Sequence, residues 1–467
     1  MTGSEPLWGP APGEPTRHGW RTPVTAPGPR GGAMLRSFGL VRRDPLSYLR
    51  EVWVEHGDVV QFPVPFPPTY LITSPGGVRR VLQDNHLGYG KRTIQYDALS
   101  LVTGEGLLTS DTDAWRPMRR RIQPAFHHEA IAPVADHVVA SASSMASRWS
   151  EAIGSTSAAV IDVDQAMMES TVQIVGSALF GVDLAGEARI LADATVEALD
   201  VVVARARMPL PIPTWLPTPN ALRLRRHVRT LDECVNALVR QRLARGDVDG
   251  NPDLLDLLLA DADDGGALSA RQVRNEVVTF LVAGHETVAS ALAWAFWLLS
   301  RSPVWSERVR SEVDSLTEPL TVESLRHLAT TRAVLEETLR LYPPAWLITR
   351  RAVAEDIVDG HRIPQGALVA ISPWLVHRHP DVWAAAETFD PQRFLGVAEP
   401  NRPAYLPFGT GPRQCIGRDF ALVEATLMLA YVLRRFDLRP IPGRTQGAVA
   451  SVTLRPDGGL PMLVSHR

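Results

Sequence analysis

The chain is poor in cysteine and lysine, and it has no strong excess of either charge. Only Cys234 and Cys415 occur among 467 residues, far apart and in no CxxC or Cys/His cluster. This spacing argues against a disulfide framework and a zinc finger, and it favours a reducing, cytoplasmic location. Lys91 is the only lysine, and a formal net charge of -3 gives no sign of nucleic-acid binding.

Long apolar runs are also scarce. Residues 1–33 are rich in Pro and Gly, without the apolar run of a signal peptide. We therefore expect a flexible arm without a membrane anchor, followed by one domain over residues 34–467. The stretch from Val277 to Leu299 is long enough to cross a bilayer, but Glu286 stands in its middle. An ionisable group at that depth is costly, so a buried central helix is favoured.

Most of the remaining sequence has helical periodicity. Residues 268–303 form the clearest helix, with Ser269 and Gln272 as a capping box, and a helix of this length spans about 45 Å. Segments 57–74 and 363–372 have the pattern of strands bounded by Gly and Pro turns. The sequence therefore predicts a mainly α fold with a small, mostly antiparallel β region.

Cys415 stands in a Gly- and Pro-rich turn, LPFGTGPRQCIG, over residues 406–417. The segment 418–436 that follows is strongly helical, so the sulfur is expected near a helix N-terminus, where the dipole favours thiolate. For an isolated cysteine, a small buried hydrophobe is the alternative.

The residues around Cys415 fit the spacing F-x-x-G-x-R-x-C-x-G, which resembles the haem-thiolate loop of the cytochrome P-450 family. The resemblance implies the single-domain fold of that family, haem b as cofactor and Cys415 as the iron ligand. It also implies that glycines allow a tight turn near the haem, that the phenylalanine shields the sulfur and that the arginine binds a propionate. The further cofactor-binding residues of this loop are Phe408, Gly409, Arg413 and Gly417.

The long predicted helix carries Ala283, Gly284, His285, Glu286 and Thr287, similar to the oxygen-activation motif (A/G)-G-x-(D/E)-T of the same family. The resemblance implies that Ala283 and Gly284 lie against the haem, and that Gly284 loosens the helix there. It also implies that Thr287 and Glu286 are catalytic, because they bring protons to the oxygen. An acid beside an alcohol is by itself more often structural.

A second helical segment, EETLRLYPP, contains Glu337 and Arg340 one turn apart. Alone, such a pair is usually a surface salt bridge of little worth. It resembles the family's E-x-x-R, which pairs with an arginine of a later P-x-R-F segment, here Arg393. The resemblance implies a structural triad that supports the cysteine loop and takes no part in the chemistry.

Two more positions resemble propionate-binding residues of the family. Trp115 and Arg119 fit a W-x-x-x-R segment, although the tryptophan could simply pack in the core. Arg351 matches another such position, and because Arg350 is adjacent, the register is open by one residue.

The implied reaction inserts one oxygen atom of O2 into a C–H bond or a double bond of a small molecule. The chain has no flavin or nicotinamide motif, so its electrons must come from separate proteins, by resemblance a ferredoxin and its reductase. A basic surface would suit an acidic ferredoxin, and the candidates are Arg119, Arg120, Arg121 and Arg418.

The expected substrate is hydrophobic, because the residues placed near the haem by resemblance are nearly all apolar. They are Phe280, Ala283, Ala345, Trp346, Leu347 and Val452, with residues 206–220 as the ceiling of the pocket. A terpenoid or polyketide biosynthetic step is favoured, and a fatty acid comes next.

Two other readings stay open. A haem-binding helper protein without turnover would keep the fold, although such proteins commonly lose the ligand or the acid–alcohol pair, which are present here. Oxidative coupling, desaturation or peroxide-driven oxidation would use the same motifs, and peroxide use ranks lower because such enzymes often lack the pair.

Overall fold

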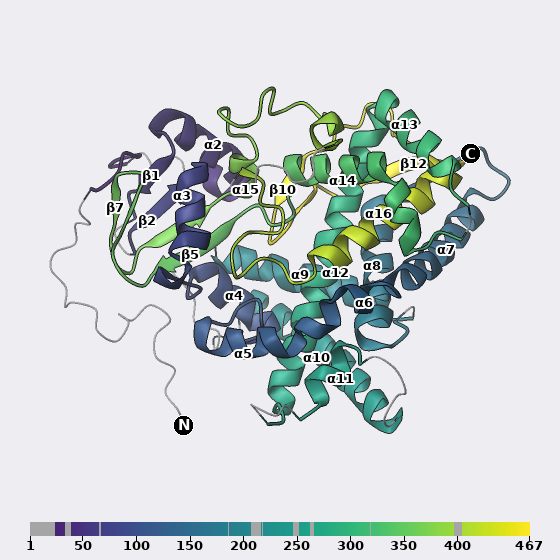
Figure 1. Cartoon of the computed structure of the whole chain (residues 1–467), viewed down its shortest axis with the longest axis horizontal. Coiled ribbons are helices and arrows are strands. Elements are labelled where there is room, and N and C mark those ends of the chain that lie inside the picture. Colours follow the sequence, from purple (N-terminus) through teal and green to yellow (C-terminus); the bar gives the residue numbers. More distant parts are fainter. Residues whose placement is uncertain are drawn as a thin grey trace.

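The structure is a computed structural model in which helices fill most of the volume and a small sheet lies at one end (Figure 1). It describes residues 24–32, 39–64, 67–184, 186–206, 216, 218–245, 252–261, 266–317, 319–396 and 404–467. Most of the predicted arm, residues 1–23, lies outside the described residues.

The helices follow one another along the whole described chain. They are α2 (Pro45–His56), α3 (Pro75–Arg79), α4 (Ile94–Thr103), α5 (Thr112–Ile122), α6 (His128–Ile131), α7 (Val134–Ile153), α8 (Val163–Phe180), α9 (Ala188–Ala206), α10 (Pro219–Arg245), α11 (Leu254–Leu259), α12 (Ala270–Ser300), α13 (Pro303–Asp314), α14 (Ala329–Leu341), α15 (Pro373–Val376) and α16 (Arg418–Arg435).

The strands form one larger sheet and three small ones. They are β1 (Val59–Phe62), β2 (Thr69–Ile72), β3 (Tyr89–Gly90), β4 (Ala159–Asp162), β5 (Ile348–Ala352), β6 (Asp356–Val358), β7 (His361–Ile363), β8 (Leu368–Ile371), β9 (Phe436–Pro440), β10 (Ala448–Ala450), β11 (Leu454–Pro456) and β12 (Pro461–His466). The larger sheet has the order β1-β2-β8-β5-β3, in which only β2 and β8 run parallel. The predicted mainly α fold with a mostly antiparallel β region is confirmed.

Helix α12 forms the axis of the core. It begins where predicted, with Ser269 as N-cap and Gln272 completing the capping box. Its apolar residues lie all around the helix, which is the pattern of a helix buried on every side. In an 18-residue apolar window, 83% of the residues are buried inside the protein, so its hydrophobicity is satisfied by packing. The helices α8, α14 and α16 pack against it (Figure 1).

Residues 24–32, which we expected within the arm, pack against the sheet. The Gln61 backbone N–H donates to the Pro27 carbonyl at 2.7 Å, and Thr25 N–H donates to the Gln61 side chain at 2.8 Å. Gly28 is needed there, because a Cβ at this position would lie 2.0 Å from the Gln61 carbonyl oxygen. The part of the chain that packs on the domain therefore begins before residue 34.

A buried ion pair on α14 holds the segments that lead to the cysteine loop. The Arg340 Nε donates to Glu337 Oε2 at 2.6 Å, and both side chains are fully buried. Arg393 Nε lies 3.5 Å from Glu337 Oε1, so the three predicted residues come together. The remaining Arg340 nitrogens donate to three backbone carbonyls, those of His377, Ala386 and Thr388.

The same network reaches the loop through His377. Its Nδ1 lies 3.0 Å from the Arg340 carbonyl, and its Nε2 accepts from the Leu406 N–H at 2.6 Å. Burial lowers the pKa of His377 to about 3, so the ring is neutral, with one nitrogen free to accept. Residue 406 begins the cysteine turn, and its position is thus fixed from α14.

Replacing Arg340 by Ala removes the closer partner of the buried Glu337 carboxyl and leaves it Arg393, whose Nε lies 3.5 Å away. We expect the free energy of unfolding to fall by about 3–5 kcal/mol, measured by chemical denaturation of the purified protein. The control is Arg362→Ala, whose partner Glu355 is at the surface, with side chains 58% and 52% exposed. That change should cost about 0–1 kcal/mol, and equal losses in both variants would contradict the buried-pair assignment.

Candidate active site

The cysteine turn is held by its own backbone. Cys415 N–H donates to the Phe408 carbonyl at 2.9 Å, and Gly409 N–H donates to Leu406 at 3.0 Å. Gly409 and Gly411 have φ of 66° and 74°, which favour glycine. A Cβ on Gly411 would also lie 2.1 Å from the Leu82 carbonyl oxygen, so this position tolerates no side chain.

Gly417 has a different role from the one expected of it. Its φ is -87°, so it needs no glycine-specific conformation, and it serves as the N-cap residue of α16. The sulfur of Cys415 therefore lies at a helix N-terminus, as predicted. The Gly417 N–H and the Arg119 guanidinium both lower the pKa of the thiol, but burial is the larger effect and raises it overall.

Cys415 is accessible to solvent although protein atoms crowd around it closely enough to desolvate the thiol. Part of Cys415 is thus open to a ligand while the rest is surrounded by protein. A metal ion can bind a thiol there, and a thiol that coordinates a metal is deprotonated. The accessibility of Cys415 therefore allows it to bind a ligand.

Basic side chains converge near the cysteine turn. Lys91 is 7% exposed, and desolvation followed by the charges of Arg350 and Arg413 holds its pKa well below the usual value. Its Nζ donates to the Leu108 carbonyl at 2.6 Å. Arg413 donates to the Ser110 carbonyl at 2.7 Å and lies over the Trp115 ring at 4.6 Å. Trp115 therefore packs in the core and also stacks on Arg413, whose orientation it helps to fix.

The two adjacent arginines of β5 act on different partners. Arg350 is 8% exposed and acts on Lys91 and Arg413, so it belongs to the cationic cluster. Arg351 acts on Asp97 instead. The sequence pattern named Arg351 with the register open by one residue; the structure places Arg350 in the cationic cluster, and the propionate-binding role of Arg351 stays a prediction.

Whether a haem fits beside these basic side chains depends on how many carboxylates already neutralise them. Arg350, Arg413 and Lys91 are opposed in the described part of the chain by Asp111, whose Oδ1 lies 3.6 Å from Arg413. Three largely buried basic side chains with one carboxylate among them suit an anionic ligand, such as the two propionates of haem. Arg119 is different: its Nη1 donates to the Gln414 carbonyl at 3.0 Å, so it braces the turn.

One short face of α12 is accessible. Between residues 275 and 297 every residue is buried except Ala283, Gly284 and Thr287. These three lie one turn apart, on one side of the helix. The Thr287 hydroxyl donates to the Ala283 carbonyl at 2.9 Å. Of the predicted oxygen-activation residues, Ala283, Gly284 and Thr287 are thus on the uncovered face, and Glu286 is not.

Gly284 does not interrupt the helix, since α12 runs unbroken from Ala270 to Ser300. A Cβ at Gly284 would lie 2.9 Å from a methyl group of Val175 on α8. The observed reason for glycine is close packing of α8 against α12, and not the expected loosening of the helix.

Glu286 points away from this open face into a buried polar cluster. It is 2% exposed, and the Thr453 hydroxyl donates to its Oε1 at 2.8 Å. Burial raises the pKa of Glu286 to about 7, against the opposing charge of Arg455 and the Thr453 hydrogen bond. A carboxyl group with this pKa can both hold and release a proton near neutral pH.

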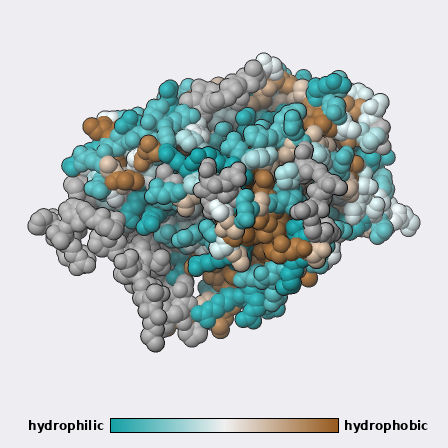
Figure 2. All heavy atoms as spheres, turned by 60° about the horizontal axis from the view of Figure 1, so that its bottom comes forward, coloured by the Kyte–Doolittle hydropathy of each residue, from teal (hydrophilic) through white to brown (hydrophobic). Residues whose placement is uncertain are grey.

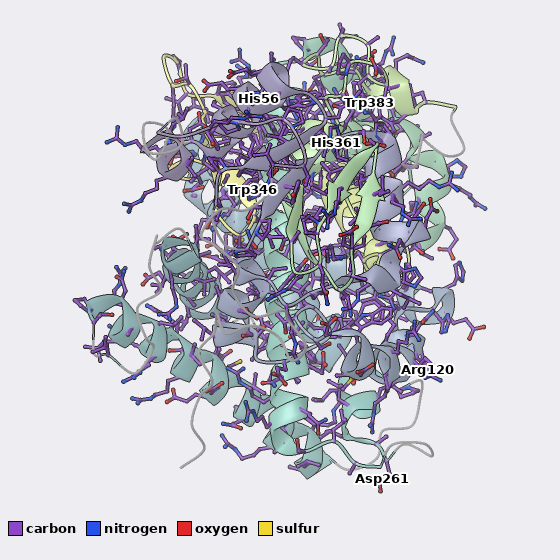
Figure 3. All side chains as sticks on the ribbon, turned by 90° about the vertical axis from the view of Figure 1, so that its left-hand side faces the viewer. His56, Arg120, Asp261, Trp346, His361 and Trp383 are labelled. Carbon is purple, nitrogen blue, oxygen red and sulfur yellow. The ribbon has the colours of Figure 1, made fainter. Side chains whose placement is uncertain are left out.

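The cysteine turn and α12 are linked by Phe126. A Cβ on Gly417 would lie 3.7 Å from the Phe126 ring, and this ring stacks on Phe280 at 5.5 Å between centroids. Among the predicted pocket residues, Ala345, Leu347 and Val452 are at least partly accessible. Phe280 and Trp346 are buried in packing, and Trp346 Nε1 donates to the Ser451 carbonyl at 2.9 Å (Figure 3). Most of the predicted ceiling, 206–220, lies outside the described residues.

A cleft of about 600 Å³ lies where α4, α9 and α10 meet. Its apolar lining includes Leu101, Val201 and Leu224, and Arg205 and Arg229 stand at its edge. Figure 2 shows the molecule turned so that the bottom of Figure 1 faces the reader. Apolar side chains gather on this face and are bordered by hydrophilic ones. An apolar ligand has a ready surface on this side of the protein.

Comparison with known proteins places these observations in a family. The family model described as Cytochrome P-450 matches residues 26–456. The chain is 36% identical over 440 residues to cyclooctatin synthase of Streptomyces melanosporofaciens, covering 92% of each chain. It is 32% identical over 420 residues to pentalenene oxygenase of Streptomyces avermitilis, covering 88% of this chain and 91% of the relative.

Solved structures give the same answer for the fold. The crystal structure of CYP175A1 from one strain of Thermus thermophilus has a TM-score of 0.75 and 33% identity, covering 93% of this chain and 98% of that one. A 6-coordinated cytochrome P-450 from another strain of the same species has a TM-score of 0.71 and 33% identity, covering 91% and 98%.

The structure adds Glu276, which the sequence analysis overlooked. This residue of α12 is 2% exposed, and its Oε2 accepts from the Leu107 N–H at 3.0 Å, tying α12 to the loop before α5. The available signal was an acidic residue directly before the apolar run that begins at Val277 in the long predicted helix. Burial raises the pKa of Glu276 to about 7.

The raised pKa of Glu276 makes stability depend on pH. Between pH 4.5 and about 7 the folded protein holds a proton that the unfolded chain releases, so the free energy of unfolding falls as pH rises. The loss is about 3 kcal/mol as an order of magnitude. Denaturation at several pH values should show a flatter profile for Glu276→Gln than for the unaltered protein. Glu51→Gln, at an exposed position of α2, is the control, and an unchanged slope in Glu276→Gln would contradict the assignment.

Proposed function

Since this chain belongs to the cytochrome P-450 family of haem-thiolate monooxygenases, we propose that it oxidises a hydrophobic terpenoid on the accessible face of α12. The observation that carries the proposal is that Ala283, Gly284 and Thr287 are uncovered in a helix buried elsewhere between residues 275 and 297. Small side chains and one hydroxyl leave room for an apolar molecule and supply a single polar group.

The cofactor of the family is haem, which activates O2 so that one oxygen atom enters the substrate and the other leaves as water. Cys415 would hold the iron from its turn, with the Gly417 N–H directed at the sulfur. The propionates would be held by Arg350, Arg413 and Lys91. Among the described residues, Asp111 is the one carboxylate that opposes these basic side chains, so the cluster can accept further negative charge. Trp115 would keep Arg413 in place by stacking.

Thr287 and Glu286 would move protons at the site. The Thr287 hydroxyl is on the open face, hydrogen-bonded to the Ala283 carbonyl, and it can turn to donate to oxygen. Glu286 lies next to it in sequence, in the cluster that reaches Arg455 and Asp200. Its pKa of about 7 allows it to give up a proton and take another at neutral pH.

The substrate class rests on the relatives together with the apolar surroundings. Cyclooctatin synthase, cyclooctat-9-en-7-ol 5-monooxygenase and pentalenene oxygenase are Streptomyces enzymes that align over most of this chain. Their names refer to terpenoid compounds, and the partly accessible Leu347 and Val452 suit such a hydrocarbon. A terpenoid is thus favoured over a fatty acid or a polyketide.

The enzyme takes its electrons from separate redox proteins, and we propose a ferredoxin with its reductase. Of the expected docking arginines, Arg119 braces the cysteine turn, and Arg121 donates to carbonyls of Leu257 and Gly266. Arg120 and Arg418 are exposed, on α5 and at the start of α16. Figure 3 shows Arg120 at the right-hand side, below the sheet and above Asp261. With two free cysteines, the protein suits the cytoplasm.

The first test is an absorbance titration of the ferric holoprotein with sesquiterpenes, diterpenes, fatty acids and macrolide aglycones. A terpenoid should shift the haem band saturably towards the high-spin form. Ala283→Phe fills the open face and should weaken that binding about tenfold or more, because the added ring occupies the same space. Ala384→Phe, on an exposed loop, is the control and should leave it unchanged.

A saturable shift with fatty acids or macrolides and with no terpenoid would contradict the substrate class. Absence of haem from the purified protein would contradict the function as a whole.

The second test concerns the electron donor. Reversing the charge of Arg120 and Arg418 together should raise the KM for a ferredoxin several-fold while kcat changes little, because steering acts on encounter. The effect should shrink at high salt. Arg439→Glu, an arginine 73% exposed on β9, is the matched control. If KM rises equally in the Arg120/Arg418 double variant and in Arg439→Glu, Arg120 and Arg418 are not part of the docking surface.

A further inference from the structure

Three carboxyl groups surround one arginine at the buried end of Glu286. Arg455 on β11 donates to Asp164 Oδ2 on α8 at 2.6 Å, and their side chains are 13% and 4% exposed. Arg455 also acts electrostatically on Glu286 of α12 and on Asp200 of α9. Four elements that are distant in sequence therefore share this one cation.

The turn between β10 and β11 connects the cluster to the surface. Thr453 donates to Glu286 Oε1 at 2.8 Å, and Ser451 donates to Asp200 Oδ1 at 2.9 Å. Glu286 is buried, whereas Asp200 is exposed. The turn thus lies between a buried acid and a carboxylate in contact with water.

This turn is fixed against α12. Ser290 and Trp294 donate to the same carbonyl, that of Leu454, at 2.6 and 2.9 Å. The backbone of Arg455, the next residue, is therefore fixed beside Ser290 of α12, and Glu286 lies one helical turn before Ser290. The side chain of Arg455 is less constrained, since its Nε has no hydrogen-bond partner in the described chain.

The charges in the cluster do not balance. Asp164, Asp200 and Glu286 bring three carboxyl groups, and Arg455 brings one positive charge. Asp164 Oδ1 is buried without a partner among the described residues, so the arginine satisfies only part of this carboxylate. Asp164 and Glu286 are the two buried carboxyl groups, and like charges that share one buried cation do not both ionise readily, so this buried pair retains a proton. His285 does not compensate, because burial lowers its pKa to about 4 and keeps it neutral.

We propose that Arg455 is a positioning residue for the oxidation: shared between Asp164 and Glu286, it determines whether Glu286 holds the proton that it passes towards Thr287. When Glu286 releases its proton it becomes a carboxylate, and Arg455 is close enough to balance the new charge. The next proton comes from water at the exposed Asp200. This inference rests on the proposed proton-transfer role of Glu286.

Two substitutions should move the ionisation of Glu286 in opposite directions. Arg455→Gln removes the cation that favours the carboxylate, so Glu286 should stay protonated to a higher pH. Asp164→Asn removes a negative charge and frees Arg455 for Glu286, so Glu286 should ionise at a lower pH. Each midpoint should move by about one pH unit or more.

The midpoint is read from the carboxyl infrared band of the ferric holoprotein, identified as the band lost in Glu286→Gln. The share of electrons recovered in product, measured against pH, should follow the midpoint in each variant. Arg455→Lys should restore most of the original midpoint. Arg439→Gln, the exposed arginine of β9, should not move it. If Arg455→Gln does not fold, Asp164→Asn with its retained hydrogen bond still gives the decisive shift.

An unmoved midpoint in the variants that fold, or shifts in the same direction, would overturn the role of Arg455 itself. If Glu286→Gln still couples electrons to product normally, the proposed proton-transfer role of Glu286 is wrong. The inference about Arg455 then fails as well, because it rests on that role. The spectroscopic and catalytic readouts thus separate the two failures.

Discussion

The buried pair of Glu337 and Arg340 is the interaction on which the geometry of the site depends. Arg340 binds one carboxylate and three backbone carbonyls, and its own carbonyl is held by His377, which in turn receives the Leu406 N–H. This chain of contacts ends at the first residue of the cysteine turn. The Cys415 sulfur is thus placed by a charge pair many residues earlier in sequence, and a buried pair is costly to break.

Buried charge is divided between the two sides of the site. Lys91, Arg350 and Arg413 gather near the cysteine turn with one nearby carboxylate, Asp111. Around Glu286 the balance is reversed, with the buried carboxyl groups of Glu286 and Asp164 and the exposed Asp200 to one arginine. The first arrangement suits an anionic cofactor and the second retains a proton. Both arrangements have the same physical cause. Burial removes water from the charged groups, so the ionisation of each group is set by the charges and hydrogen bonds next to it.

The structure also changes the reasons for some expected residues. Gly284 permits α8 to approach α12 through Val175, and Gly417 caps α16 in an ordinary conformation. Phe280 and Trp346 are packing residues, whereas Ala345, Leu347 and Val452 remain at least partly accessible. A motif can thus name the right residue while the contact that requires it lies in another part of the chain.

The sequence by itself determined the family, the cysteine turn, the acid–alcohol pair and the limits of the central helix, because each lies in a short segment with fixed spacing. Tertiary structure decided the rest. The place of Arg350 in the cationic cluster depends on the facing of β5 in the sheet. The partners of Glu286, namely Thr453, Arg455 and Asp164, come from elements more than a hundred residues away. Spacing along a chain records local geometry, whereas burial and charge balance arise only when distant segments pack together.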